Sequence, residues 1–146
     1  MSSPSKPALV LFGVVALHLM VGAQGTAALA AGAPEKPYRL ETVEGSPLKR
    51  IVLTPKAAER LGIKTGQIGK DAAGKLIAPF RALYYDMTGQ AWVYTSPEAL
   101  SFVRHKVSVE RVEGDNVFLI DGPPDGTRVV TAGAAELYGT ERGIGH

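Results

Sequence analysis

The sequence predicts an all-β domain with minor helix content, a small antiparallel barrel or sandwich with one or two short helices. The first observation is the alternation of apolar and polar residues over positions 102–112, which is typical of a half-buried antiparallel strand. One face of this strand would carry Val103, His105, Val107 and Val109, and the other face Arg104, Lys106, Ser108 and Glu110.

Two turn signals are the other observations that predict a β-domain. Glu113-Gly114-Asp115 joins the alternating strand to a second one, because a glycine in a short connection supplies the positive φ that tight hairpins need. Residues 122–126 contain two prolines between two glycines and form a rigid turn before residues 127–131, four of which are β-branched. Residues 134–137 then make a last helical turn.

The early part of the chain adds a strand, a short helix and another strand. Residues 49–53 are β-rich, Thr54 is a suitable helix N-cap, and Pro55 stands at the first helical position, where its missing N–H is not needed. The helix ends at Gly62, and residues 63–68 return to a strand.

The middle of the chain is predicted as a turn and three more strands. Residues 69–74 form the turn, and short strands at 76–78 and 82–85 flank Pro79, which suits a strand start or sheet edge because it lacks an N–H. Residues 86–90 form a hairpin connection to an aromatic strand.

Length and composition favour a single small domain with extensions at both ends. The chain has 146 residues and 45% hydrophobic content, enough for one core. We expect a leader at 1–30, a proline- and charge-rich linker at 31–47, the β-domain at 48–139 and a flexible tail at 140–146.

The N-terminus has the pattern of an export signal. Lys6 precedes an apolar run at residues 8–21, interrupted by His18 as a tolerated polar residue, and small residues suited to cleavage follow. An uncleaved membrane anchor is the alternative, because no charge stands between Lys6 and Glu35. Either way we expect an extracytoplasmic protein, in the periplasm or at the outer face of the cytoplasmic membrane.

Charge and cysteine content exclude several classes of function. Sixteen basic and fourteen acidic residues give a net charge of +2 without a clustered basic face, so we expect no nucleic-acid binding. The chain has no cysteine, which excludes disulfides, thiolate metal sites and a cysteine nucleophile.

No catalytic, cofactor or metal site is predicted, and we expect that the protein is not an enzyme. The serines stand in no nucleophile-elbow context, and the glycine-rich end lacks a P-loop or dinucleotide pattern. His105 is expected to be a partly buried residue that a hydrogen bond satisfies; a pH-responsive role is the alternative. His146 falls in the tail. The serines considered are Ser46, Ser96, Ser101 and Ser108.

Aromatic and basic residues offer the remaining candidate surface. The aromatic residues are expected to pack in the core, with Trp92 as the main anchor, although a recognition surface is the alternative. They are Tyr84, Tyr85, Trp92, Tyr94 and Phe102. Arg81, Arg104 and Lys106 are expected to form a solvated sheet face that discourages edge pairing; a docking surface beside the membrane or for an acidic partner is the alternative.

The order of several motifs is informative. A proline-led strand (residues 79–86) precedes a W-V-Y strand (91–94), a basic alternating strand, a G-D hairpin and a G-x-x-V-V-x-x-G-A ending at 126–134. This arrangement resembles the C-terminal membrane-proximal domain of periplasmic adaptor subunits (membrane fusion proteins) of resistance-nodulation-division efflux systems. Residues 51–65 resemble an earlier segment of the same family.

The resemblance implies a composite domain. In full adaptors the lipoyl, helical-hairpin and barrel domains lie between two chain segments that fold together. Here only residues 67–76 separate those segments, so the parts that build the tube would be missing. The resemblance covers about residues 48–139.

The expected function is that of a non-enzymatic accessory in an envelope efflux system, acting through contacts with an inner-membrane transporter or a full-length adaptor. The step from fold to function is an association, because one fold hosts unrelated roles. The alternative is a stand-alone extracytoplasmic module that binds a small molecule in an apolar cavity, and a truncated gene remnant is a third.

Overall fold

The computed structural model describes Pro4 and residues 33–144. The chain divides into Met1–Ala33 and Pro34–His146, and the fold below belongs to the second unit. Apart from Pro4, the predicted leader lies outside the described residues, as does His146. Among the described residues, no helix is both long and apolar enough to span a membrane.

Two antiparallel sheets form an all-β sandwich with minor helix content, as predicted. The larger sheet has the order β1-β2-β8-β7-β11-β3, with β6 also paired to β7. Its strands are β1 (Tyr38–Thr42), β2 (Lys49–Leu53), β3 (Lys64–Gln67), β6 (Tyr84–Tyr85), β7 (Ala91–Glu98), β8 (Ser101–Lys106) and β11 (Arg128–Ala132).

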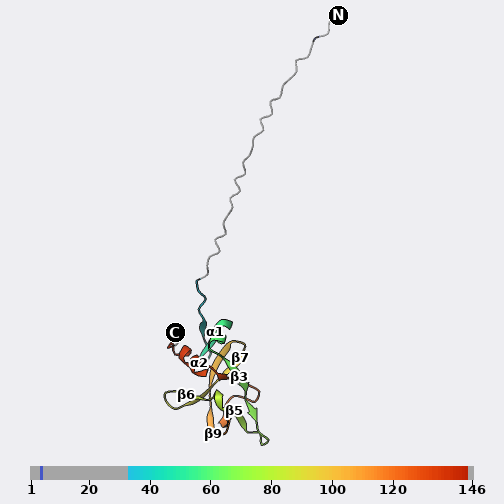
Figure 1. The fold of residues 1–146 in the computed structure, drawn as a ribbon, viewed down its shortest axis with the longest axis vertical. Coiled ribbons are helices and arrows are strands. Elements are labelled where there is room, and N and C mark those ends of the chain that lie inside the picture. Colours follow the sequence, from blue (N-terminus) through green and yellow to red (C-terminus); the bar gives the residue numbers. More distant parts are fainter. Residues whose placement is uncertain (1–3, 5–32, 145–146) are drawn as a thin grey trace. The chain divides into compact units, whose positions relative to one another are not determined.

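The smaller sheet has the order β4-β5-β10-β9. Its strands are β4 (Gly69–Lys70), β5 (Leu76–Pro79), β9 (Ser108–Glu113) and β10 (Asn116–Asp121). Each described sheet ends in edge strands, β1 and β3 in the larger and β4 and β9 in the smaller, so the sandwich is the form realised. Figure 1 shows the helices α1 (Pro55–Arg60) and α2 (Ala134–Glu141) at one end of this unit, with β5 and β9 at the other.

The central strands β7 and β11 of the larger sheet are buried on both faces, to which their successive side chains point in turn. Val93 and Val129 face the smaller sheet, whereas their neighbours Tyr94 and Val130 face the helices. All four side chains are fully buried. The sequence pattern predicted strands with one solvent-exposed face. It did not predict that helices cover this second face.

Two of the chain's crossings between the sheets take place at a single buried residue. Ile68 separates β3 from β4, and Val107 separates β8 from β9; both are 1% exposed. The N–H of Ile68 donates to the carbonyl of Thr127, which holds the first crossing. The prediction of one continuous strand over residues 102–112 is therefore wrong, because the chain turns at Val107 to bury that side chain between the sheets.

The early strand-helix-strand unit is confirmed. The side chain of Thr54 accepts a hydrogen bond from the N–H of Ala57, and Pro55 opens the helix.

The last glycine of the predicted ending has a steric reason: Gly133 has φ +91°, and a Cβ there would lie 2.4 Å from Cδ1 of Ile63. Only glycine combines that backbone conformation with such a close approach.

Two boundaries of the domain differ from those predicted. The linker predicted at residues 31–47 contains β1, which pairs with all five residues of β2. The tail predicted to begin at residue 140 starts inside α2, where Thr140 is 6% exposed. Neither extension has a strong period, and tertiary pairing rather than local pattern orders them.

Smaller differences concern the middle of the chain. Phe80–Ala82 forms a 3-10 turn, so the strand predicted at 82–85 shortens to β6. Part of the turn predicted at 69–74 is strand β4, and Asp71 then opens the connection to β5. The hairpins at 86–90 and at Glu113-Gly114-Asp115 are confirmed, with φ +79° at Gly89 and +57° at Gly114.

Candidate functional site

The three residues predicted as a basic docking face do not share one environment. Arg81 and Lys106 are exposed. The side chain of Arg104 is only 15% exposed, because α2 covers the part of the larger sheet on which it lies. The expectation that Arg104 belongs to a solvated face is therefore wrong.

Arg104 instead lies in a mostly buried cluster of charged and aromatic side chains. Its Nε is 3.0 Å from Oε1 of Glu141, near enough for an ion pair although the N–H is not aligned for a hydrogen bond. Its guanidinium lies 4.5 Å from the centre of the Trp92 ring and 5.8 Å from that of Tyr138. Such stacking is favourable for a planar cation that has lost part of its hydration.

The carboxylate of Glu141 also binds the most deeply buried aromatic residue. The hydroxyl of Tyr94, which is 0% exposed, donates to Oε2 of Glu141 at 2.7 Å. Tyr84 stacks on Tyr94 with ring centres 5.4 Å apart, and its buried hydroxyl has no hydrogen-bond partner among the described residues. Burial raises the pKa of Tyr84 to about 12. Burial first, and then the bond to Glu141, raise the pKa of Tyr94 further above its usual value.

Trp92 is not the core anchor that the sequence predicted. It is half-buried, and its indole N–H donates to Oδ2 of Asp86 at 2.9 Å. Tyr94 and Phe102 fill the core instead, at 0% and 2% exposure. The alternation along β7 places Trp92 and Tyr94 on the same face, as predicted, but only Tyr94 lies far enough from the hairpin to be covered on all sides.

Asp86 organises the β6–β7 hairpin. Its Oδ1 accepts hydrogen bonds from the backbone N–H groups of Thr88 and Gln90 and from the hydroxyl of Thr88. These bonds, led by those from Thr88 and Trp92, hold the pKa of the Asp86 carboxyl well below its usual range. One carboxylate therefore fixes both the turn and the tryptophan at the base of the hairpin.

The tip of this hairpin exposes apolar surface. Met87 is 92% exposed and Tyr85 is 58% exposed. The backbone of the turn that follows Tyr85 is held by hydrogen bonds to Asp86. Cross-strand pairing places Tyr84 opposite Trp92, and Trp92 opposite Lys106. The exposed cation Lys106 thus lies one strand from the base of the hairpin. We call Tyr85, Met87 and Lys106 the hairpin surface.

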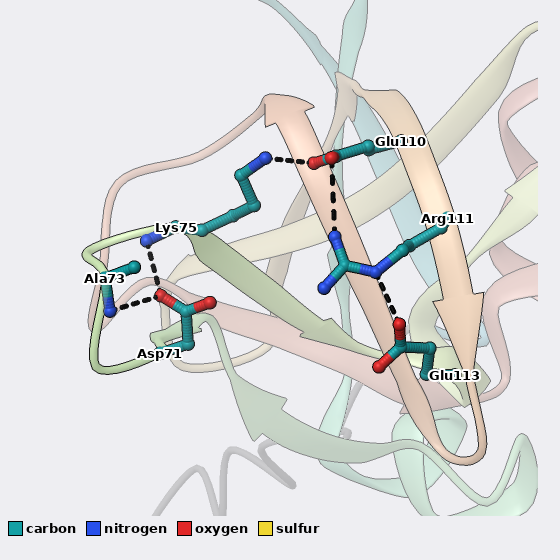
Figure 2. Close-up of polar contacts among 6 residues, drawn as sticks. All are labelled: Asp71, Ala73, Lys75, Glu110, Arg111 and Glu113. Atoms are coloured by element: carbon teal, nitrogen blue, oxygen red, sulfur yellow. Dashed lines mark hydrogen bonds and ion pairs between the residues drawn. The ribbon is translucent and has the colours of Figure 1, made fainter.

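A second polar group lies on the smaller sheet and is shown in Figure 2. Lys75 pairs with Glu110, and Arg111 bridges Glu110 and Glu113. Asp71 accepts the N–H groups of Ala73 and Lys75 and closes the β4–β5 turn. Glu110, Arg111 and Glu113 lie along edge strand β9, where charged side chains discourage pairing with another sheet. We assign them a structural role.

His105 is exposed rather than partly buried. Its Nδ1 lies 2.8 Å from the carbonyl oxygen of Lys106. Within residues 33–144, no three histidine or carboxylate side chains gather as metal ligands.

Comparison of the chain with family models, curated proteins and solved structures finds no match. The resemblance to the adaptor domain therefore stays a prediction from the motifs.

Sequence reasoning missed Glu141 and Asp86. Glu141 was assigned to a flexible tail, and only the position of α2 brings it to Arg104. The signal for Asp86 was present: an aspartate that opens a turn commonly accepts backbone N–H groups two residues on, and Trp92 follows at the first strand positions.

Proposed function

We propose that this chain is a non-enzymatic, adaptor-like accessory of an extracytoplasmic efflux transport system. It would act through protein contacts with an inner-membrane transporter or a full-length adaptor. The leader pattern supports placement outside the cytoplasm, and the motif order supports the adaptor-like class.

One observation carries this proposal. The early segment pairs with the late one at two places: β2 pairs with β8, and β3 pairs with β11. The resemblance expects this composite of two chain segments, and a tight turn at Asp71 stands where full adaptors carry their inserted domains. The pairing supports the resemblance, and the resemblance supplies the functional class.

The hairpin surface is the contact region that we propose. Exposed methionine and tyrosine side chains on a hydrogen-bonded turn can enter a partner's apolar pocket without ordering the backbone, and a flexible methionine adapts to the shape of that pocket. Lys106 is an exposed cation on the neighbouring strand β8, on the sheet face that also carries Trp92. Arg104 has a different task, because its ion pair fastens α2 to the strand that carries Lys106.

Site-specific photo-crosslinking in intact cells tests the proposal. A photoreactive residue replaces Met87 or Lys106, and Glu44, an exposed residue in the β1–β2 turn, is the control position. We expect crosslinks from Met87 and Lys106 to a transporter or adaptor subunit, identified by mass spectrometry, and none from Glu44. Crosslinks equally strong at Glu44, or none at Met87 and Lys106, would contradict the proposal.

Fractionation of the same cells tests the compartment. N-terminal sequencing of the protein from the periplasmic or membrane fraction distinguishes a cleaved leader from an anchor. Recovery of the full chain in the cytosol would refute export and with it the proposed function.

A further inference from the structure

An apolar recess on the helix side of the domain lies between α1, α2 and the first two strands. It has a volume of about 350 Å³. Its walls include Tyr38, Leu53, Ala57 and Leu61, which belong to or pack against the helix-side core. Small-molecule sites in proteins commonly occupy about 300–1,000 Å³ and have mainly apolar walls with few polar groups.

The walls of this pocket are held in place before any ligand arrives. Tyr38 and Leu53 are paired residues of β1 and β2. Ala57 stands in the first turn of α1, where its N–H is bonded to the cap residue Thr54. A preformed site of this kind loses little conformational entropy when it is filled.

Gly139 lines the pocket at a position where the fold does not require glycine. It stands within α2, where glycine disfavours the helix relative to alanine. A Cβ at this position would meet no heavy atom within 4 Å, so neither close packing nor backbone conformation requires glycine. Because Gly139 lines the pocket, a side chain here would project into unoccupied space at the site.

The charged groups at the pocket are one cation and one anion. Arg60 comes from the last turn of α1 and Glu136 from the first turn of α2. Both are exposed, and within residues 33–144 neither takes part in an ion pair. Thr140, by contrast, is satisfied, because its hydroxyl donates to the carbonyl of Glu136.

We propose that this pocket binds a small zwitterionic amphiphile. Its apolar body would lie against Leu53, Ala57 and Leu61, its anionic group would face Arg60, and its cationic group would face Glu136. A purely anionic head group would be attracted by Arg60 and repelled by Glu136, and a purely cationic one the reverse. A head group that carries both charges can be attracted by both residues. This inference does not rest on the proposed transport role.

Titration of the full chain with octylphosphocholine, below its micelle concentration, tests the site by NMR. We expect saturable shifts at the amides of Leu53, Ala57 and Thr140. Octyl glucoside, octanoate and octylammonium have a similar chain with a neutral, anionic or cationic head, and we expect each to bind at least about tenfold more weakly. Absence of saturable binding by octylphosphocholine, for any reason, overturns the site, and equal binding by octyl glucoside overturns the recognition of the head group.

Variants that fill the pocket or remove its charges complete the test. Gly139→Leu should lower the affinity at least about tenfold, whereas Gly69→Leu is the matched control at a glycine that also has free space and a negative φ. Unfolding temperatures of both variants are compared with wild type, and Gly139→Ala replaces Gly139→Leu if leucine disturbs the fold. Unchanged affinity in a folded Gly139→Leu protein would place the ligand elsewhere.

The charge variants use neighbours on α1 as controls. Arg60→Gln and Glu136→Gln should each weaken octylphosphocholine several-fold, while Lys56→Gln and Glu59→Gln should not, because these exposed residues do not line the pocket. Equal effects of all four substitutions would contradict recognition by Arg60 and Glu136.

Discussion

Arg104 on β8 and Glu141 at the end of α2 lie 3.0 Å apart across the helix-covered face of the larger sheet. Their side chains are 15% and 5% exposed. Glu141 also accepts the hydroxyl of Tyr94 from the middle of the same sheet. Apolar contacts of Ala134 and Leu137 hold α2 against the sheet. The carboxylate of Glu141 adds an ion pair and a hydrogen bond to the same sheet.

Glu141→Ala should lower the free energy of unfolding by about 3 kcal/mol, because loss of one partner leaves the other charge covered and unpaired. Chemical denaturation of the two proteins measures the difference. Glu59→Ala, at an exposed helical position, is the control and should change it by less than about 0.5 kcal/mol. Equal stability of Glu141→Ala and wild type would show that the pair contributes nothing.

Tyr94→Phe and Tyr84→Phe should have opposite consequences, although the two rings stack on each other. The first substitution removes a hydrogen bond to a buried carboxylate and should cost about 2 kcal/mol. The second removes a buried hydroxyl without a partner and should be neutral or slightly stabilising. Denaturant midpoints distinguish the two, and a larger cost for Tyr84→Phe would reverse our assignment of the hydrogen bond.

Alkaline pH should destabilise the domain through the same tyrosines. Burial raises the pKa of Tyr84 from 10.0 to about 12 in the folded state. The unfolded chain therefore loses its proton first, and the free energy of unfolding should fall as the pH rises from about 10 towards about 12. Tyr84→Phe should reduce this slope in pH-dependent denaturation; an identical slope would exclude Tyr84 as its source.

Acid pH should act on the β6–β7 hairpin through Asp86. Hydrogen bonds from Thr88 and Trp92 depress the pKa of this carboxyl, so the stability it contributes is present above its ordinary pKa near 4 and is lost as the pH falls below it. Trp92 is the only tryptophan, and its fluorescence should keep its neutral-pH spectrum until well below pH 4. In Asp86→Asn this acid transition should disappear, and its persistence there would assign it to another group.

Local patterns were sufficient to predict the elements whose signals lie in a few neighbouring residues. Thr54 and Pro55 predicted the start of α1, and Gly89 and Gly114 predicted hairpins, because capping and positive φ are local requirements. The all-β class followed from the alternation of residues in the C-terminal third.

Features that depend on tertiary contact were not predicted. The sequence of β1 shows no clear alternation of apolar and polar residues. It forms a strand because all five of its residues pair with β2. The alternation of residues predicts that Arg104 faces solvent, but α2 covers it in the folded domain. The bend at Val107 depends on the burial of that side chain in the core, which the local sequence does not encode. The candidate surface therefore differs from the predicted one. Lys106 is exposed as predicted, Arg104 instead pairs with Glu141 under α2, and Met87 at the hairpin tip is an additional exposed residue.

The composite pairing of an early and a late chain segment is tested most directly by an insertion of thirty Gly/Ser residues after Asp71. Loop closure should cost about 1–2 kcal/mol, because it grows only as the logarithm of loop length. The same insertion after Gly45, in the β1–β2 turn, is the control. We predict that both proteins keep the fluorescence of Trp92 and a cooperative unfolding transition. Loss of folding after Asp71 alone would show that the two segments need their tight local connection, and would contradict the composite domain on which the proposed function depends.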